Sequence, residues 1–119
     1  MLRTVLVVDD DPDFRRLAAR MLSAMGMEVV AEAGTVASAV TAAADLRPDA
    51  ALVDVGLPDG DGITLARELA ALPWRPRIVL TSSDPDVTTP ESARSVGAAG
   101  FIAKDRLPDG SLRIMFADG

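Results

Sequence analysis

Cysteine, histidine and tyrosine are absent from this chain of 119 residues, and aromatic residues make up only 3% of it. Without cysteine there is no disulfide and no thiolate metal site, which fits a reducing compartment. Without histidine there is no Ser-His or Cys-His catalytic pair and no zinc site that needs imidazole. With so few aromatic residues, the core must be built from Val, Leu, Ile, Met and Ala.

Basic residues are too few to balance the acidic ones, and the net charge is −6. Because nucleic acid binding requires a basic surface, we expect no direct nucleic acid partner. The apolar runs are short and interrupted, so we expect no membrane span, and the N-terminus lacks the layout of a secretory signal. We therefore expect a cytoplasmic protein whose residues 1–119 form one domain around one core.

Short apolar runs alternate with helical patterns along the chain. The β-branched run at 5–8 has no polar face, which is typical of a strand buried on both sides. Asp11 and Pro12 favour the start of a helix, and Gly26 favours its end. The patterns predict strands at 5–8, 28–33, 50–55, 77–81 and 100–103, and helices at 12–25, 34–46, 63–72, 89–97 and 111–117.

This alternation predicts the fold class α/β, with a single doubly wound, five-stranded parallel sheet and helices on both faces. Right-handed crossovers make that sheet the natural solution. The corresponding strand order is 2-1-3-4-5, the flavodoxin-like arrangement, in which the first and third strands flank the point where the strand order reverses.

Polar side chains lie at the carboxyl ends of the predicted strands. Asp9 and Asp10 follow the first strand, and Asp54 comes at the end of the third. In an open parallel sheet these ends share one edge, and ligands bind in the crevice there. Three converging carboxylates repel one another unless one is protonated or a cation lies among them. Oxygen ligands alone favour Mg²⁺, or Mn²⁺, with coordination positions left for a phosphoryl oxygen.

Thr81 and Lys104 end the fourth and fifth predicted strands, on the other side of Asp54. A hydroxyl and an ammonium there can hold phosphoryl oxygens. A nucleophilic carboxylate, a divalent ion and a cationic group are the parts that in-line phosphoryl transfer needs. Lys104 is the only lysine among 12 basic residues, which supports a site that requires a compact ammonium.

Four segments at these strand ends, in this order and spacing, resemble the receiver domain of two-component response regulators. They read VVDDDP at 7–12, LVDVGLPDGDG at 52–62, VLTS at 79–82 and GAAGFIAK at 97–104, and the resemblance covers nearly the whole chain. It implies that Asp54 is the phosphoacceptor. It also implies a set of Mg²⁺ ligands: Asp9, Asp10, Asp54 and the backbone carbonyl of Val55.

The resemblance further implies a switch. Thr81 is similar to the family's switch hydroxyl, which moves toward the phosphoryl group while an aromatic residue, here Phe101, turns inward. Lys104 is similar to the family's lysine at this site. The implied donor is a phosphohistidine on a sensor histidine kinase. The surface of the fourth helix, fifth strand and fifth helix would then signal to an output domain or target protein, and a homodimer is compatible with this role.

A receiver of this kind is a signalling switch that catalyses only its own phosphorylation and dephosphorylation. One alternative is a degenerate receiver that acts as a phosphorylation-independent interaction scaffold. Pro90 favours it, because proline cannot lie in the middle of the fourth helix, and we expect a short helix beginning at Thr89–Pro90. Another alternative is a Mg²⁺-dependent phosphohydrolase, which usually has a second acidic residue two positions after the nucleophile. Gly56 at that position argues against it.

Asp59 and Asp61 are interpreted as turn residues, and Phe101 as either a switch residue or a core residue.

Overall fold

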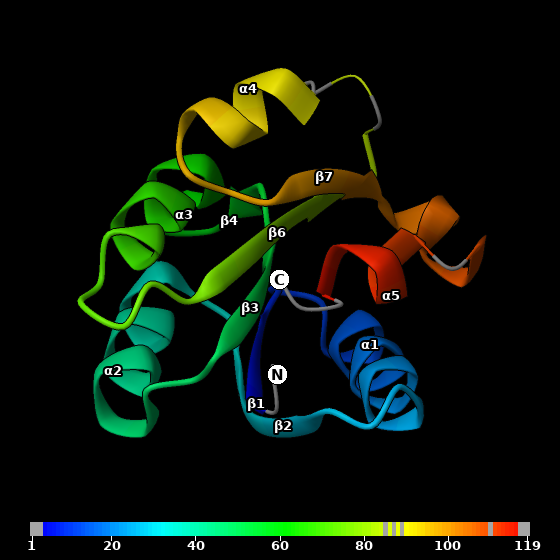
Figure 1. Cartoon of the computed structure of the whole chain (residues 1–119), viewed down its shortest axis with the longest axis horizontal. Coiled ribbons are helices and arrows are strands. Elements are labelled where there is room, and N and C mark those ends of the chain that lie inside the picture. Colours follow the sequence, from blue (N-terminus) through cyan, green and yellow to red (C-terminus); the bar gives the residue numbers. More distant parts are fainter. Residues whose placement is uncertain (1–3, 85, 87, 89, 110, 117–119) are drawn as a thin grey trace.

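A parallel sheet between two layers of helices forms the structure, a computed structural model that describes residues 4–84, 86, 88, 90–109 and 111–116 (Figure 1). The strands of this sheet are β1 (Thr4–Val8), β2 (Glu28–Ala33), β3 (Ala50–Asp54), β6 (Arg77–Ser82) and β7 (Gly100–Ala103). Their order is β2-β1-β3-β6-β7, and every neighbouring pair is parallel. Counted within the sheet, this is the predicted order 2-1-3-4-5.

The helices are divided between the two faces of the sheet. α1 (Pro12–Ala24) and α5 (Ser111–Phe116) cover one face, and α2 (Val36–Leu46), α3 (Gly62–Ala70) and α4 (Pro90–Ser95) cover the other (Figure 1). Each face has its own apolar cluster, one holding Leu22, Leu112 and Phe116, the other Ala39, Leu65 and Ala93. Because both faces are covered, every residue of β3 is buried, and so are residues 5–8 of β1, as the lack of a polar face in that run predicted.

Capping residues place the ends of the helices as the sequence indicates. The Asp11 carboxylate accepts a hydrogen bond from the Asp13 N–H (3.0 Å) at the start of α1. Gly26 follows the end of α1 with φ of +87°, a left-handed conformation that glycine adopts without steric cost. Thr35 and Ser38 form a capping box at the start of α2.

The segment at 56–62, in which Asp59 and Asp61 are interpreted as turn residues, has regular structure of its own. It contains a two-stranded antiparallel hairpin of β4 (Gly56–Leu57) and β5 (Gly60–Asp61). α3 begins one residue earlier than predicted, because the Asp61 carboxylate accepts a hydrogen bond from the Ile63 N–H (3.0 Å) and caps it.

The last third of the chain confirms a short fourth helix. α4 begins at Pro90, where proline fits the first turn of a helix, and it has six residues. Thr89 lies outside the described residues, as does Ala117 of the predicted last helix. Lys104 begins a 3₁₀ helix, η1 (Lys104–Asp109), which the sequence pattern did not predict. Within the described part of the chain, no helix has the length and apolar character needed to cross a membrane.

Candidate metal and phosphoacceptor site

Three carboxylates meet at the carboxyl edge of β1 and β3, as the strand ends predicted. One oxygen each of Asp9, Asp10 and Asp54 lies within 4.8 Å of the others. They come together because β1 and β3 are hydrogen-bonded neighbours in the sheet. Asp9 and Asp54 are buried, with 0% and 6% of their surface exposed, whereas Asp10 faces solvent. The cluster is therefore open to a ligand on the side of Asp10.

Lys104 supplies the positive charge beside these carboxylates. Its Nζ lies 2.6 Å from Asp9 Oδ2 and 3.8 Å from Asp54 Oδ1. The other oxygen of Asp9 accepts a hydrogen bond from the Asp11 N–H (2.9 Å). Since a buried carboxylate is costly without partners, these two contacts account for an Asp9 side chain with no exposure to solvent.

The surroundings of Asp54 act on the pKa of its carboxyl in both directions. Burial first, and the neighbouring Asp9 carboxylate second, raise the pKa of Asp54 from 3.8 to about 6. The Lys104 ammonium and a hydrogen bond from the Gly56 N–H act in the opposite direction and lower it. A carboxylate that is largely buried is suited, in its ionised form, to act as a nucleophile.

Thr81 lies next to Asp54 in the pairing of β3 with β6. Its side chain is 0% exposed, and its Oγ1 has no hydrogen-bond partner among the described residues. A buried hydroxyl without a partner costs free energy, so a ligand that supplies an acceptor here gains affinity. Phe101 is 9% exposed and belongs to the apolar cluster under α3 and α4.

The loop after Asp54 shapes the site through its backbone. The Val55 carbonyl, the fourth predicted metal ligand, accepts a hydrogen bond from the Gly62 N–H (2.8 Å), which uses one of its two lone pairs. Gly62 lies so close to Asp54 that a Cβ atom there would be 1.9 Å from the Asp54 carbonyl oxygen. Only glycine fits at this position, and this tight packing fixes the end of β3 against the start of α3.

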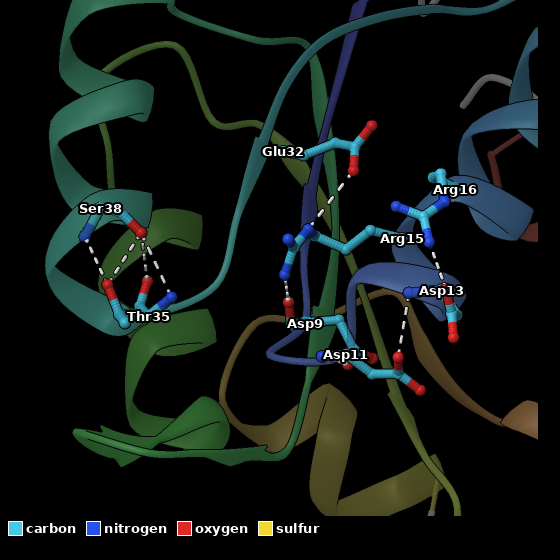
Figure 2. A network of polar contacts seen from close by, with 8 residues as sticks. All are labelled: Asp9, Asp11, Asp13, Arg15, Arg16, Glu32, Thr35 and Ser38. Carbon is cyan, nitrogen blue, oxygen red and sulfur yellow. Dashed lines mark hydrogen bonds and ion pairs between the residues drawn. The ribbon is translucent and has the colours of Figure 1, made fainter.

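Arg15, whose contact with Asp9 places it beside the site, is not identified from the sequence, and Asp59, interpreted as a turn residue, lies in a turn but has further contacts that the sequence did not predict. Arg15 of α1 donates a hydrogen bond from Nη1 to the Asp9 carbonyl, and its Nε lies 3.3 Å from Glu32 Oε1 at the end of β2 (Figure 2). Asp59 in the hairpin turn accepts hydrogen bonds from the N–H groups of Val36 (2.7 Å) and Ala37 (3.1 Å). The position of Arg15 one helical turn after Asp11 was a weak signal; for Asp59 no local signal exists.

The donors at this edge fit a hard divalent cation. They are carboxylate oxygens with a backbone carbonyl nearby, and no nitrogen or sulfur ligand is present in a chain without histidine or cysteine. One of the three carboxylates is exposed, which leaves room for the water ligands that Mg²⁺ retains.

Comparison with known proteins connects this geometry to a family. The model of the response regulator receiver domain matches residues 5–113. The transcriptional activator DevR/DosR of Mycobacterium tuberculosis is 40% identical over 103 residues, covering 85% of this chain and 47% of that protein. The chemotaxis protein CheY of Bacillus subtilis is 34% identical over 104 residues, 87% of each chain.

One solved structure of similar fold contains a phosphorylated aspartic acid. It is a response regulator from Burkholderia pseudomallei with a phosphorylated aspartic acid, a calcium ion and citrate. The TM-score is 0.82 at 26% identity, over 95% of this chain and 66% of that one. The chain thus spans about half the length of DevR/DosR and most of the length of CheY. From its family match and its sheet topology, the chain belongs to the response regulator receiver domains of two-component systems.

Proposed function

We propose that this chain accepts a phosphoryl group on Asp54 from a sensor histidine kinase, with Mg²⁺, or Mn²⁺, held by Asp9, Asp10 and Asp54. The observation that carries the proposal is a buried carboxylate, Asp54, in a cluster of three carboxylates, with the Lys104 ammonium 3.8 Å away. The phosphorylated aspartic acid and the calcium ion of the Burkholderia protein support it.

In the transfer step, an oxygen of the Asp54 carboxylate attacks phosphorus, and the bond from phosphorus to the donor breaks. Its electron pair leaves with the donor group, a histidine nitrogen or the carboxylate of an acyl phosphate. When bound, the divalent ion would screen the carboxylates and accept a phosphoryl oxygen. Lys104 keeps its proton and donates a hydrogen bond to a second phosphoryl oxygen, and the Thr81 hydroxyl donates to a third.

The new group changes the balance of charge at this edge of the sheet. A phosphoryl group adds a charge of about −1.5 to −2 and three acceptor oxygens. Thr81 and Lys104 gain a partner, and we infer that their movement, with Phe101, repacks the surface of α4, β7 and α5. This surface would contact an output domain or a target protein. Such a change biases an equilibrium between two packings of the same fold.

A phosphorylation-independent scaffold is the second candidate. The observation that favours it is the limitation of α4 to six residues, which reduces the usual output surface. The intact set of Asp54, Thr81 and Lys104 favours the switch.

The deciding experiment is intact mass spectrometry after incubation with Mg²⁺ and acetyl phosphate. We expect a gain of one phosphoryl group in the wild type and in an Asp45→Asn control on the exposed side of α2, and no gain in Asp54→Asn. No gain in the wild type would favour the scaffold. Continuous release of phosphate from unrelated phosphomonoesters would favour a phosphohydrolase.

A further inference from the structure

We propose that Phe14 is a positioning residue for phosphoryl transfer, because its ring holds the Lys104 ammonium beside Asp54. Lys104 Nζ lies over the Phe14 ring, 4.3 Å from its centroid. A cation at this distance is attracted by the negative face of the ring. The inference rests on the proposed function, since the place of Lys104 affects transfer only if Asp54 accepts the phosphoryl group.

Three groups surround the ammonium and together determine where it lies. Asp9 Oδ2 is 2.6 Å away, Asp54 Oδ1 is 3.8 Å away, and the Phe14 ring covers a further side. The Lys104 side chain is only 18% exposed, so the contact with the ring is largely desolvated and is stronger than at an open surface. Lysine has a flexible four-carbon stem, and without such contacts its ammonium would be free to sample many positions.

Phe14 is itself well fixed. It is the third residue of α1, which Asp11 caps and Pro12 begins. Its side chain packs against the apolar cluster under α1 and α5. Helical side chains lean toward the N-terminus of their helix, here toward the edge of the sheet where Asp9 lies. The ring therefore forms a fixed surface against which the Lys104 ammonium lies.

The ring should matter most at the moment of transfer. As the oxygen of Asp54 bonds to phosphorus and the acyl carboxylate leaves with its electron pair, Lys104 remains protonated and must lie near the phosphoryl oxygens. Loss of the ring would spread the ammonium over other positions. From the strength of a partly desolvated cation–π contact, we expect Phe14→Leu to lower the phosphorylation rate about three- to tenfold.

The single lysine of this chain allows a direct test of the contact. Protein grown with [¹³C]lysine gives one set of lysine signals in a ¹H–¹³C spectrum, that of Lys104. We expect the ring of Phe14 to shift the ε-proton signal of Lys104 upfield. Phe14→Leu should remove that shift, Phe14→Tyr should keep it, and Leu17→Ala on the exposed side of the same helix should leave it unchanged.

The same four proteins are then phosphorylated with acetyl phosphate and Mg²⁺ and followed by intact mass. We expect Phe14→Leu to be slower, and Phe14→Tyr and Leu17→Ala to react at the wild-type rate. A ring shift that persists in Phe14→Leu would overturn the contact. A lost shift with an unchanged rate would overturn the positioning role while the proposed function stands. A wild type that takes no phosphoryl group would overturn the proposed function, and this inference with it.

Discussion

At the scale of single residues, the charge on Asp54 opposes folding. The folded protein raises the pKa of this carboxyl from 3.8 to about 6, so between these pH values it binds a proton more tightly than the unfolded chain does. The contribution of this group to the free energy of unfolding is therefore greatest below its ordinary pKa and declines as the pH rises through about 6.

We accordingly expect Asp54→Asn to be more stable than the wild type at neutral pH without divalent ions, by about 2 kcal/mol. The difference should disappear below the ordinary pKa of the carboxyl, where both side chains are neutral. Urea unfolding across this pH range, with a chelator present, measures it. A variant less stable than the wild type at neutral pH would show that the charge does not oppose folding.

Besides the proposed chemical role, Lys104 has a structural one, since it pairs with the Asp9 carboxylate, whose side chain is 0% exposed. Lys104→Met leaves Asp9 buried without its cation, and we expect a loss of about 3 kcal/mol in the free energy of unfolding. Arg67→Met on the exposed side of α3 is the matched control. Urea unfolding in chelator should separate the two variants, and equal stabilities would argue against this ion pair as a stabilising contact.

At the scale of elements, the hairpin of β4 and β5, which follows β3, contacts the start of α2. Asp59 in its turn accepts hydrogen bonds from the first two N–H groups of α2, and these bonds lower the pKa of Asp59. Its stabilising contribution is therefore present at neutral pH and is lost as the pH falls through that lowered pKa.

We expect Asp59→Ala to speed amide hydrogen exchange at Val36 and Ala37, because both N–H groups lose their acceptor. Asp45→Ala, an exposed residue near the other end of α2, should leave these amides unchanged. Exchange measured by NMR on both variants is the test. Unchanged exchange in Asp59→Ala would mean that water replaces the carboxylate at no cost.

The junction of β3 with α3 is the tightest contact between elements at the site. A methyl group at Gly62 would meet the Asp54 carbonyl, whereas one at Gly56 would meet no atom within 4 Å. We expect Gly62→Ala to lower the free energy of unfolding by about 3 kcal/mol and Gly56→Ala to change it little. Thermal or urea unfolding of the two variants tests this expectation. Similar losses of unfolding free energy in both variants would contradict the packing argument.

At the scale of the whole molecule, the candidate metal ligands come from two strands of one sheet. A ligand that binds only the folded chain stabilises all of it, by about 2.7 kcal/mol at a hundred times its dissociation constant. We expect Mg²⁺ to raise the midpoint of thermal unfolding of the wild type, and to do so far less in Asp10→Asn. Asp10 is chosen because it is exposed, so that its substitution scarcely disturbs the fold without metal. Equal shifts in both proteins would place the metal elsewhere.

Local patterning alone was enough for most of the fold. Runs without a polar face predicted the buried strands, and Asp11, Gly26 and Pro90 predicted helix ends, because capping and backbone geometry act between residues close in sequence. The rule that parallel strands share an edge also predicted that Asp9, Asp10 and Asp54 would meet.

Contacts that depend on packing between distant segments could not be predicted from local sequence patterns. Examples are the contact of Asp59 with α2, the ring of Phe14 over Lys104, and the Thr81 hydroxyl, which has no partner in the part of the chain that the structure describes. The spacing of these residues in the sequence carries no periodic signal. The distances between such side chains depend on where each helix packs on the sheet, to within a few ångströms. A change of a few ångströms is enough to make or break a hydrogen bond or an ion pair. The sequence pattern therefore predicted the candidate site residues, and only the packed structure gave the contacts that each of them makes.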